Sequence, residues 1–408
     1  MDVTPATPDR PDNRPDNRAD NRPDNHPDNR HGHHGGPLGD RLAREPRMLP
    51  EDARRSNRGL ILRALHHGGP ASRADLAKLV RLTPATVSAV IKELLEAELV
   101  DELGRTSGSI GKPATMVGIE PDARHIVTVS LSEPDQFVGA VVNLAGKVVL
   151  RRTYERNDRT GGEALSLLGA ICDDLVGDAE RPLLGIGVAT PGIVATDGTV
   201  LRAARLGWSK VHVAHELAAG TGLNVYVAND ANASALAELT FGVAHSSDFL
   251  MVRVDQGVGV GLVLDGALYR GSRSASGEIG HVVVDPEGSV CTCGKRGCLE
   301  TEISAPLLGR RLGAADGAGE IEILRRAGER LGTALATVLS ALDIGDVILS
   351  GPEPVATETF RQATLDAVAA RTMPEISDEL TLRASSFGDD DVVLGAAALV
   401  LDEELDIR

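Results

Sequence analysis

The side chains best suited to chemistry in this sequence are one histidine and three cysteines that lie close together. His281 ends the run Gly-Glu-Ile-Gly-His, and Cys291, Cys293 and Cys298 follow it within a glycine-containing stretch. Three thiolates and one imidazole suit tetrahedral Zn²⁺, and glycines let the backbone fold tightly around an ion. Four protein ligands leave no open position for a reacting water, so we expect a structural Zn²⁺ site. A coincidental clustering of cysteines and a redox switch are the alternatives, and the isolated Cys172 is expected in a helix core.

A second group of polar residues surrounds this cluster in the sequence. Asn229 and Asp230 stand where an apolar run turns into a helical pattern, and the end of a strand is where α/β proteins place ligands. An amide can both donate and accept hydrogen bonds, while the carboxylates of Asp230, Glu278 and Glu300 accept strongly. This donor and acceptor set suits the adjacent hydroxyls of a sugar. Helix capping by Asn229 and Asp230 is the alternative.

Length and composition limit the classes of function that these residues can belong to. The chain has 408 residues, enough for two or three domains, and a net charge of -17, so any DNA contact must be local. Aromatic residues make up 2%, which leaves little ring surface for stacking on unpaired bases. No apolar run is long enough to cross a membrane and no signal peptide is apparent, so we expect a cytoplasmic protein without a membrane partner.

The first fifty residues differ from the rest of the chain. Residues 1–50 repeat Pro-Asp-Asn-Arg with variants, and His31, His33 and His34 follow among glycines. With almost nothing apolar to bury, this low-complexity tail is expected to be disordered. The histidines could bind a metal, but a solvated tail is the simpler interpretation.

Residues 51–118 have the pattern of a winged helix-turn-helix. A helical stripe ends at Gly68-Gly69-Pro70, Ser72 caps a short helix burying Leu76, Leu79 and Val80, and Thr83-Pro84 opens a third helix. That helix has one apolar face, and its other face is small or polar with one cation, as entry into a major groove requires. The segment has net charge +2, whereas residues 119–408 carry -18.

An expected β-hairpin wing follows, with its loop between Gly104 and Pro113. The predicted DNA-binding residues lie on the third helix and its cap and on the wing: Thr83, Ala85, Thr86, Ser88, Lys92, Arg105 and Lys112. Thr86, Ser88 and Lys92 are expected at base edges, and Arg105 and Lys112 at phosphates or groove walls. A packing module that touches no DNA is the alternative.

From residue 119 onward, short β-rich runs alternate with helical stretches. The runs include 126–131, 137–142, 184–189, 225–228 and 249–254, and helical patterns cover 162–175 and 321–342. This alternation predicts an α/β fold, and its length predicts two lobes around a cleft.

Together these motifs resemble the ROK family of repressors, open reading frames and kinases over about residues 54–408. The resemblance rests on the cysteine cluster, Gly-Glu-Ile-Gly-His, the Asn-Asp turn, the run 189–194 and Leu206-Gly207-Trp208. It implies a two-lobed, actin-like sugar-kinase fold, with sugar bound by Asn229, Asp230, Glu278, His281 and Glu300. His281 would place one ring nitrogen on zinc and the other toward the sugar. Asp230 matches the general base of the family's kinases.

The nucleotide-binding segments depart from the kinase pattern. Where the family's kinases have Asp-x-Gly-Gly-Thr after the first strand, this chain has Ser132-Glu133-Pro134-Asp135. The second phosphate loop begins with an acid, Asp255, and the late Gly-Gly is Gly351-Pro352. Added carboxylates and a missing N–H are unsuited to phosphate, so Asp230 is a vestigial base and no enzyme activity is expected.

The sequence therefore predicts a sugar-responsive transcriptional repressor of carbohydrate-metabolism genes. We expect a homodimer or homotetramer that places two recognition helices on a palindromic double-stranded DNA operator and responds to a sugar or sugar derivative. The first alternative is an ATP-dependent sugar kinase with a fused DNA-binding domain. The second is a regulator whose pocket takes no ordinary sugar, because Arg205 stands where many relatives have a smaller polar residue.

Overall fold

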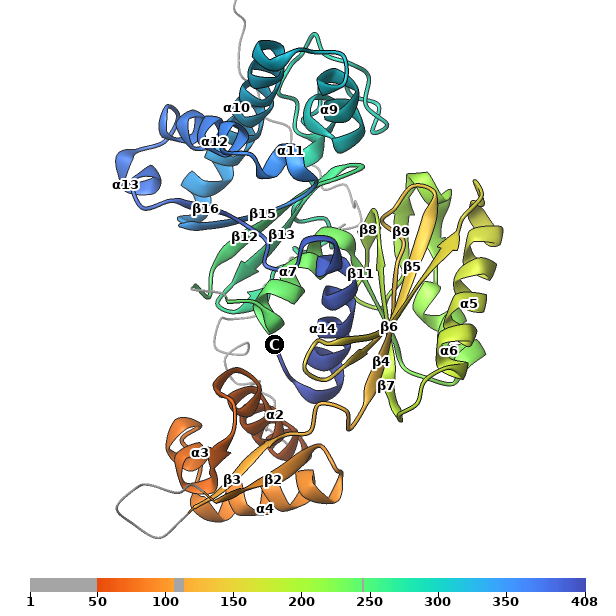
Figure 1. Ribbon diagram of the computed structural model, residues 1–408, viewed down its shortest axis with the longest axis vertical. Helices are drawn as coiled ribbons and strands as arrows, with labels where there is room; N and C mark the ends of the chain where they lie inside the picture. Colours follow the sequence, from red (N-terminus) through yellow and green to blue (C-terminus); the bar gives the residue numbers. More distant parts are fainter. Residues whose placement is uncertain (1–49, 106–113, 244–245) are drawn as a thin grey trace, which may run out of the picture. The chain divides into compact units, whose positions relative to one another are not determined.

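The computed structural model describes residues 50–105, 114–243 and 246–408, and Figure 1 shows their arrangement. The first part holds three helices, α2 (Pro50–Gly68), α3 (Arg73–Leu79) and α4 (Pro84–Glu96). Its antiparallel sheet has the order β1 (Ala71–Ser72), β3 (Thr115–Ile119), β2 (Val100–Arg105). The predicted helix-turn-helix and hairpin are confirmed. Lys112 and the Arg105 side chain lie outside the described residues.

The two predicted helix caps are present. Ser72 Oγ accepts a hydrogen bond from the Asp75 N–H at 3.2 Å, and Thr83 Oγ1 accepts one from the Thr86 N–H at 3.2 Å. The expected burial of Leu79 is wrong, since 65% of this residue is exposed. It ends a helix of only seven residues, in which Leu76 faces the core and Val80, the next residue, caps the end.

The first lobe of the larger part is built on a five-stranded sheet ordered β11-β7-β4-β5-β6. Figure 1 shows two helices on one face, α5 (Gly161–Gly177) and α6 (Val213–Thr221), and two on the other, α7 (Asp230–Phe241) and α14 (Asp391–Leu405). The strands are β4 (His125–Ser130), β5 (Gln136–Asn143), β6 (Val148–Glu155), β7 (Leu183–Thr190) and β11 (Val225–Asn229). All six residues of β4 are buried, as expected for a strand covered on both faces.

The second lobe has its own five-stranded sheet, ordered β14-β13-β12-β15-β16. Its strands are β12 (Phe249–Val254), β13 (Val258–Leu264), β14 (Ala267–Leu268), β15 (Asp346–Ser350) and β16 (Thr381–Ala384). The long helix α10 (Gly317–Leu342) packs against α12 (Glu358–Ala369) and covers this sheet. Four short helices complete the lobe: α8 (Glu300–Ile303), α9 (Ala305–Leu312), α11 (Glu353–Ala356) and α13 (Pro374–Ser377).

A small antiparallel sheet stands beside the first lobe and reaches the ligand region. It has the order β10 (Trp208–Val211), β9 (Val200–Ala203), β8 (Ile193–Val194), and the 3₁₀ turn η1 (Ala204–Leu206) joins two of its strands. Two further 3₁₀ turns are η2 (Ile279–His281) and η3 (Gly388–Asp390). Among the described residues, no helix is both long and apolar enough to cross a membrane.

Candidate functional site

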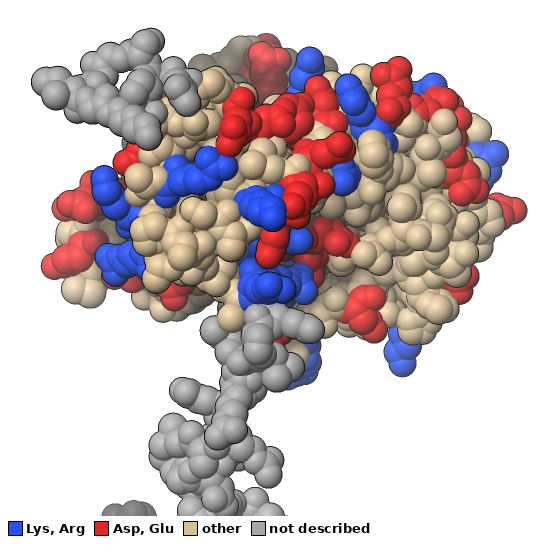
Figure 2. All heavy atoms as spheres, turned by 90° about the horizontal axis from the view of Figure 1, so that it is seen from below, with Lys and Arg blue, Asp and Glu red and all other residues tan. Residues whose placement is uncertain are grey.

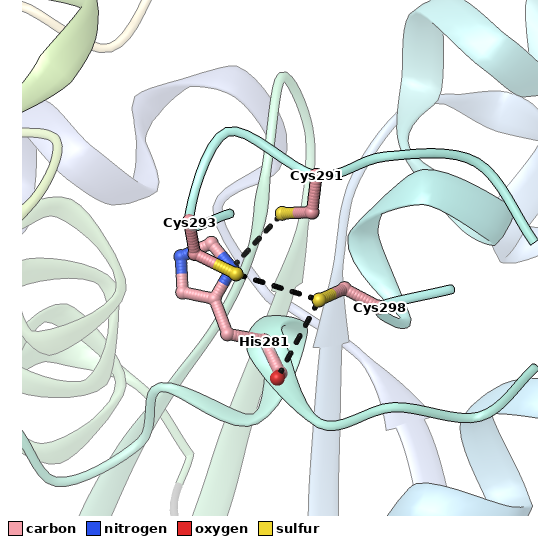
Figure 3. Close-up of side chains that lie close together, drawn as sticks. All are labelled: His281, Cys291, Cys293 and Cys298. Carbon is pink, nitrogen blue, oxygen red and sulfur yellow. Dashed lines mark hydrogen bonds between the residues drawn. The ribbon is translucent and has the colours of Figure 1, made fainter. Parts of the chain in front are cut away.

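The predicted metal ligands converge in the structure. One ligand atom from each of His281, Cys291, Cys293 and Cys298 lies within 4.8 Å of all the others. Figure 3 shows the four side chains pointing toward one another, with Cys293 Sγ 3.6 Å from Cys298 Sγ and Cys291 Sγ 3.4 Å from His281 Nδ1. The four side chains could therefore hold a metal ion. Cys172 is separate from them, buried on α5, where desolvation raises the pKa of its thiol to about 12.

Two glycines explain how His281 is positioned. Gly277 has φ +85°, and a Cβ there would lie 1.7 Å from the Val260 carbonyl oxygen. A Cβ on Gly280 would lie 2.1 Å from the Val258 carbonyl oxygen. Because neither position has room for a side chain, the segment ending at His281 lies directly against β13. A bridge between Val283 and Cys298 then holds the cysteine loop beside that segment.

The five predicted sugar-binding residues line one pocket. The pocket has a volume of about 230 Å³ and contains Asn229, Asp230, Glu278, His281 and Glu300. It is framed by the end of β11, the β12–β13 loop and the small sheet through η1. Gly257 in that loop is needed for the approach of Glu300, since a Cβ there would lie 2.6 Å from Glu300 Oε2. We call this cavity the ligand pocket.

Asn229 caps α7, Asp230 is its first residue, and both line the ligand pocket. Asn229 Oδ1 accepts from the Asn232 N–H at 3.1 Å, while its Nδ2 donates to the Gly192 carbonyl at 2.9 Å and to Asp230 Oδ1 at 3.0 Å. Asp230 Oδ1 also accepts from the Ala231 N–H at 2.9 Å. The capping interpretation and the pocket interpretation are thus compatible, because one turn supplies both.

Burial makes two carboxylates of the ligand pocket less acidic. Burial raises the pKa of Asp230, and the nearby charges of Arg253 and Arg205 oppose that rise. Burial also raises the pKa of Glu278, against the opposing effect of His281. A buried carboxylate is stabilised when hydroxyl groups donate hydrogen bonds in place of the water that burial removed. A polyhydroxylated ligand provides such donors.

His281 lies between the metal-ligand cluster and the ligand pocket. Its Nδ1 faces Cys291, whereas its Nε2 lies 3.7 Å from Glu278 Oε2 inside the pocket. A metal on Nδ1 would fix the ring orientation and leave Nε2 directed at the pocket. The two sites therefore share one side chain.

Sequence reasoning missed Arg253, which lines the ligand pocket and pairs with two aspartates. Its guanidinium donates to Asp391 Oδ1 at 2.9 Å and to Asp255 Oδ2 at 2.7 Å, and Ser350 Oγ donates to Asp391 Oδ2 at 2.6 Å. Desolvation of Arg253 would lower its pKa, but Asp391 and the other nearby carboxylates outweigh this and raise it. No local pattern links Arg253 with Asp391, because 138 residues separate them.

A second cavity of about 390 Å³ shares lining residues with the ligand pocket. Arg253 and Asp255 line both cavities. The second cavity brings together all three segments that depart from the kinase pattern, through Glu133, Asp255 and Gly351-Pro352. Burial and the charge of Asp255 raise the pKa of Glu133 there. We call it the acidic cavity.

The structure leaves most of the predicted DNA-binding residues accessible. Thr83, Ala85, Ser88 and Lys92 are exposed, and Thr86 is half-buried with its hydroxyl 2.8 Å from that of Thr83. The opposite face of α4 is buried. On the face seen in Figure 2, Lys and Arg side chains are interspersed with Asp and Glu, so this face carries charges of both signs.

Comparison with known proteins identifies relatives of similar sequence and fold. The chain is 26% identical over 381 residues to the DNA-binding transcriptional repressor Mlc of Escherichia coli, covering 85% of this chain and 93% of that protein. A crystal structure of a ROK family transcriptional regulator, a homologue of the E. coli protein, has a similar fold, with a TM-score of 0.75, 24% identity and coverage of 87% and 97%. The crystal structure of the ROK hexokinase from Thermus thermophilus is also similar, with a TM-score of 0.58 and 26% identity. The match covers 69% of this chain and 99% of the hexokinase. Residues 56–104 match the MarR family and residues 134–403 match the ROK family, so the chain belongs to the ROK family.

Proposed function

We propose that the protein is a sugar-responsive, DNA-binding transcriptional repressor. The observation that carries the proposal is that one chain joins the exposed polar face of α4 to a pocket containing Asn229, Asp230, Glu278, His281 and Glu300. A groove-reading helix and a hydroxyl-reading pocket together make a sensor. Mlc is a DNA-binding transcriptional repressor, and its 26% identity to this protein extends over most of both sequences. This similarity supports the same function here.

We assign DNA binding to residues 51–118 and ligand sensing to residues 119–408. In this scheme Thr86, Ser88 and Lys92 contact bases. Thr83 and Ala85, at the start of α4, lie next to these contacts. Arg105 and Lys112 contact phosphates. A symmetric homo-oligomer would present two copies of α4 to a palindromic operator about one helical turn apart. Ligand binding would then lower operator affinity by changing the spacing or orientation of the two copies.

The metal held by the His-Cys cluster is proposed to be Zn²⁺. With zinc–sulfur bonds of about 2.3 Å, a tetrahedron separates neighbouring sulfurs by about 3.8 Å, close to the distance between Cys293 and Cys298. The donor set of three sulfurs and one nitrogen also fits zinc. Bound zinc would cross-link the cysteine loop to η2, and His281 and Glu278 would be held in place as pocket residues.

The acidic cavity supports a regulator over a kinase. Phosphoryl transfer depends on positive groups and backbone N–H donors around the phosphates. Here Arg253 is already paired with Asp391 and Asp255, and Glu133 adds a carboxylate to the same cavity. An incoming triphosphate would meet these carboxylates and a guanidinium that is already neutralised.

One experiment tests ligand class and kinase activity together. Thermal unfolding of the purified protein is measured with D-glucose, D-xylose, N-acetyl-D-glucosamine, D-glucosamine and D-glucose 6-phosphate, each with and without MgATP. We expect at least one sugar to raise Tm and MgATP to change nothing, and a coupled assay to detect no ADP formation. Sugar-dependent ADP formation that Asp230→Asn abolishes would establish the kinase alternative.

A second candidate function has support from Arg205. This exposed arginine lines the ligand pocket, and it makes no hydrogen bond or ion pair with another described residue. It is placed by η1 and by Trp208, whose indole N–H donates to the Gly161 carbonyl at 2.8 Å. Such a cation would favour a ligand with an acidic group. A rise in Tm with glucose 6-phosphate alone would favour this second candidate.

The raised pKa of Asp230 gives a stability prediction. An acid whose pKa is higher in the folded state than in the unfolded state destabilises the fold once pH rises above its ordinary value near 3.8, and most fully above the folded value. We therefore expect Asp230→Asn to raise the Tm of the ligand-free protein at neutral pH and to remove its response to sugar. The Tm advantage should shrink as the solution is acidified. Unchanged Tm and an unchanged sugar response would contradict the placement of Asp230 in the pocket.

A further inference from the structure

Two helices lead toward the DNA-binding part of the chain, α7 from the ligand pocket itself and α14 from a residue bound to the pocket residue Arg253. At its N-terminal end, α7 is capped by Asn229 and begins with Asp230, and both residues line the pocket. At its N-terminal end, α14 begins with Asp391, which binds the pocket residue Arg253. With 12 and 15 residues, they span about 18 and 22 Å.

The C-terminal ends of both helices contact α2. For α7, His66 donates from Nε2 to the Thr240 carbonyl at 3.0 Å, and the His66 ring lies 5.7 Å from that of Phe241. For α14, Arg58 donates to the Glu404 carbonyl at 3.0 Å and Arg55 to the Glu403 carbonyl at 2.6 Å. These bonds are directed at the last carbonyls of each helix, which have no partner within the helix.

The packing between α7 and α14 leaves little freedom for one to move without the other. A Cβ on Gly395 of α14 would lie 1.8 Å from the Ala233 carbonyl oxygen of α7. The two backbones are therefore in direct contact. Glu238 of α7, fully buried, also accepts hydrogen bonds from Ser385 Oγ at 2.9 Å and the Ser386 N–H at 2.6 Å, in the segment that leads to α14.

The apolar core continues across this contact. Ile61, Leu62 and Leu65 of α2 belong to the same buried cluster as Leu401 and Leu405 of α14. A rigid helix pair joined to α2 by packing and by hydrogen bonds has the properties that a coupling element needs.

We propose that α7 and α14 form a rigid pair that transmits a change at the ligand pocket to α2, and through α2 to α4. Displacement of Asp230 or release of Asp391 from Arg253 moves the pair, and the contacts of His66, Arg55 and Arg58 pass that movement to α2. The inference rests on the proposed function only for the meaning of the pocket as a ligand site. The physical coupling itself can be tested without any ligand.

The test is amide hydrogen exchange of the full chain, with α2 as the reporter of a change at the pocket. Asp391→Asn removes the charge that pairs with Arg253, and we expect amides of α2 to exchange about 2- to 30-fold faster. Exchange in α10, which lies in the other lobe, should stay at the wild-type rate. The matched control is Asp174→Asn, because Asp174 also pairs with an arginine, Arg152, but lies on α5. Unchanged α2 exchange, or equal acceleration in α2 and α10, would overturn the proposal.

A reciprocal variant keeps the test decisive if the Asp391 variant does not fold. Arg58→Ala removes one contact between α2 and α14 at a partly exposed position, and we expect faster exchange at residues 229–233 in the pocket. Its control is Arg73→Ala, since Arg73 pairs with Glu102 inside the DNA-binding part. Equal exchange at 229–233 in the two variants would refute the coupling. A failure of every sugar to raise Tm, with positive results here, would instead count against the proposed function alone.

Discussion

Replacing Ser88 with glutamate is expected to lower operator affinity by about 100-fold or more. Ser88 is exposed on α4, whose buried face is formed by residues that include Val87, Val90 and Ile91. A glutamate there would place a carboxylate in a major groove lined by phosphates, and it would remove the base contact that we propose for Ser88, a kind of contact worth about 1–3 kcal/mol. In a symmetric dimer both half-sites lose this contact, so the cost is doubled.

The measurement needs an operator, which selection from a random duplex library with the wild-type protein supplies. Affinity for that duplex is then compared by fluorescence anisotropy at one fixed salt concentration, because the phosphate contribution varies strongly with salt. The control is Arg326→Glu, a larger charge change on the exposed face of α10. We expect it to bind the operator within a fewfold of wild type. Equal losses in the two variants would show that α4 does not read the groove.

The other large effect is expected from Cys293→Ser. This change removes one of the four proposed metal ligands, and a hydroxyl is a poor replacement for a thiolate. We expect the variant to purify without stoichiometric zinc and with a Tm lower by about 5–10 °C, because metal binding is coupled to folding of the loop. The sugar response should weaken as well, since His281 would lose its fixed orientation beside Glu278.

Metal analysis by mass spectrometry and thermal unfolding check this prediction on the same samples. Cys172→Ser is the matched control, because that thiol lies in the core of α5 and outside the His-Cys cluster. It should keep its zinc and its sugar response even if core packing costs some stability. Zinc-free wild-type protein with a full sugar response would disprove the proposed role of the cluster.

The parts of the fold that could be predicted depend on local signals. Alternation and apolar runs indicated β4, β5, β7, β11 and β12, and capping residues marked the starts of α3 and α4. The strands β14, β15 and β16 of the second sheet were not predicted. The helix α14 gave no such signal. Twelve of its fifteen residues are buried, including Val392, Val393 and Gly395, so it lacks the polar face that identifies a helix in a sequence.

The candidate site divides in the same way. The four residues of the proposed metal site could be found because their residue types are rare and their spacing is short. Arg253, Asp391 and Glu238 could not, because each is defined by partners more than a hundred residues away. Leu79 is a residue that was predicted to be buried and is exposed. Its helical spacing suggested burial, but the spacing does not reveal that α3 ends at this residue, where no other described element packs over it.

Trp208 has a practical consequence. It is the only tryptophan in the chain, it is buried, and it holds η1, which carries the pocket residues Ala204 and Arg205. Selectively excited indole emission from the unmodified protein therefore comes from one point beside the pocket. A ligand titration followed by that emission therefore reports binding at the pocket without a label. The same signal, recorded during addition of DNA, would show whether DNA binding at α4 changes the environment of Trp208 beside the pocket.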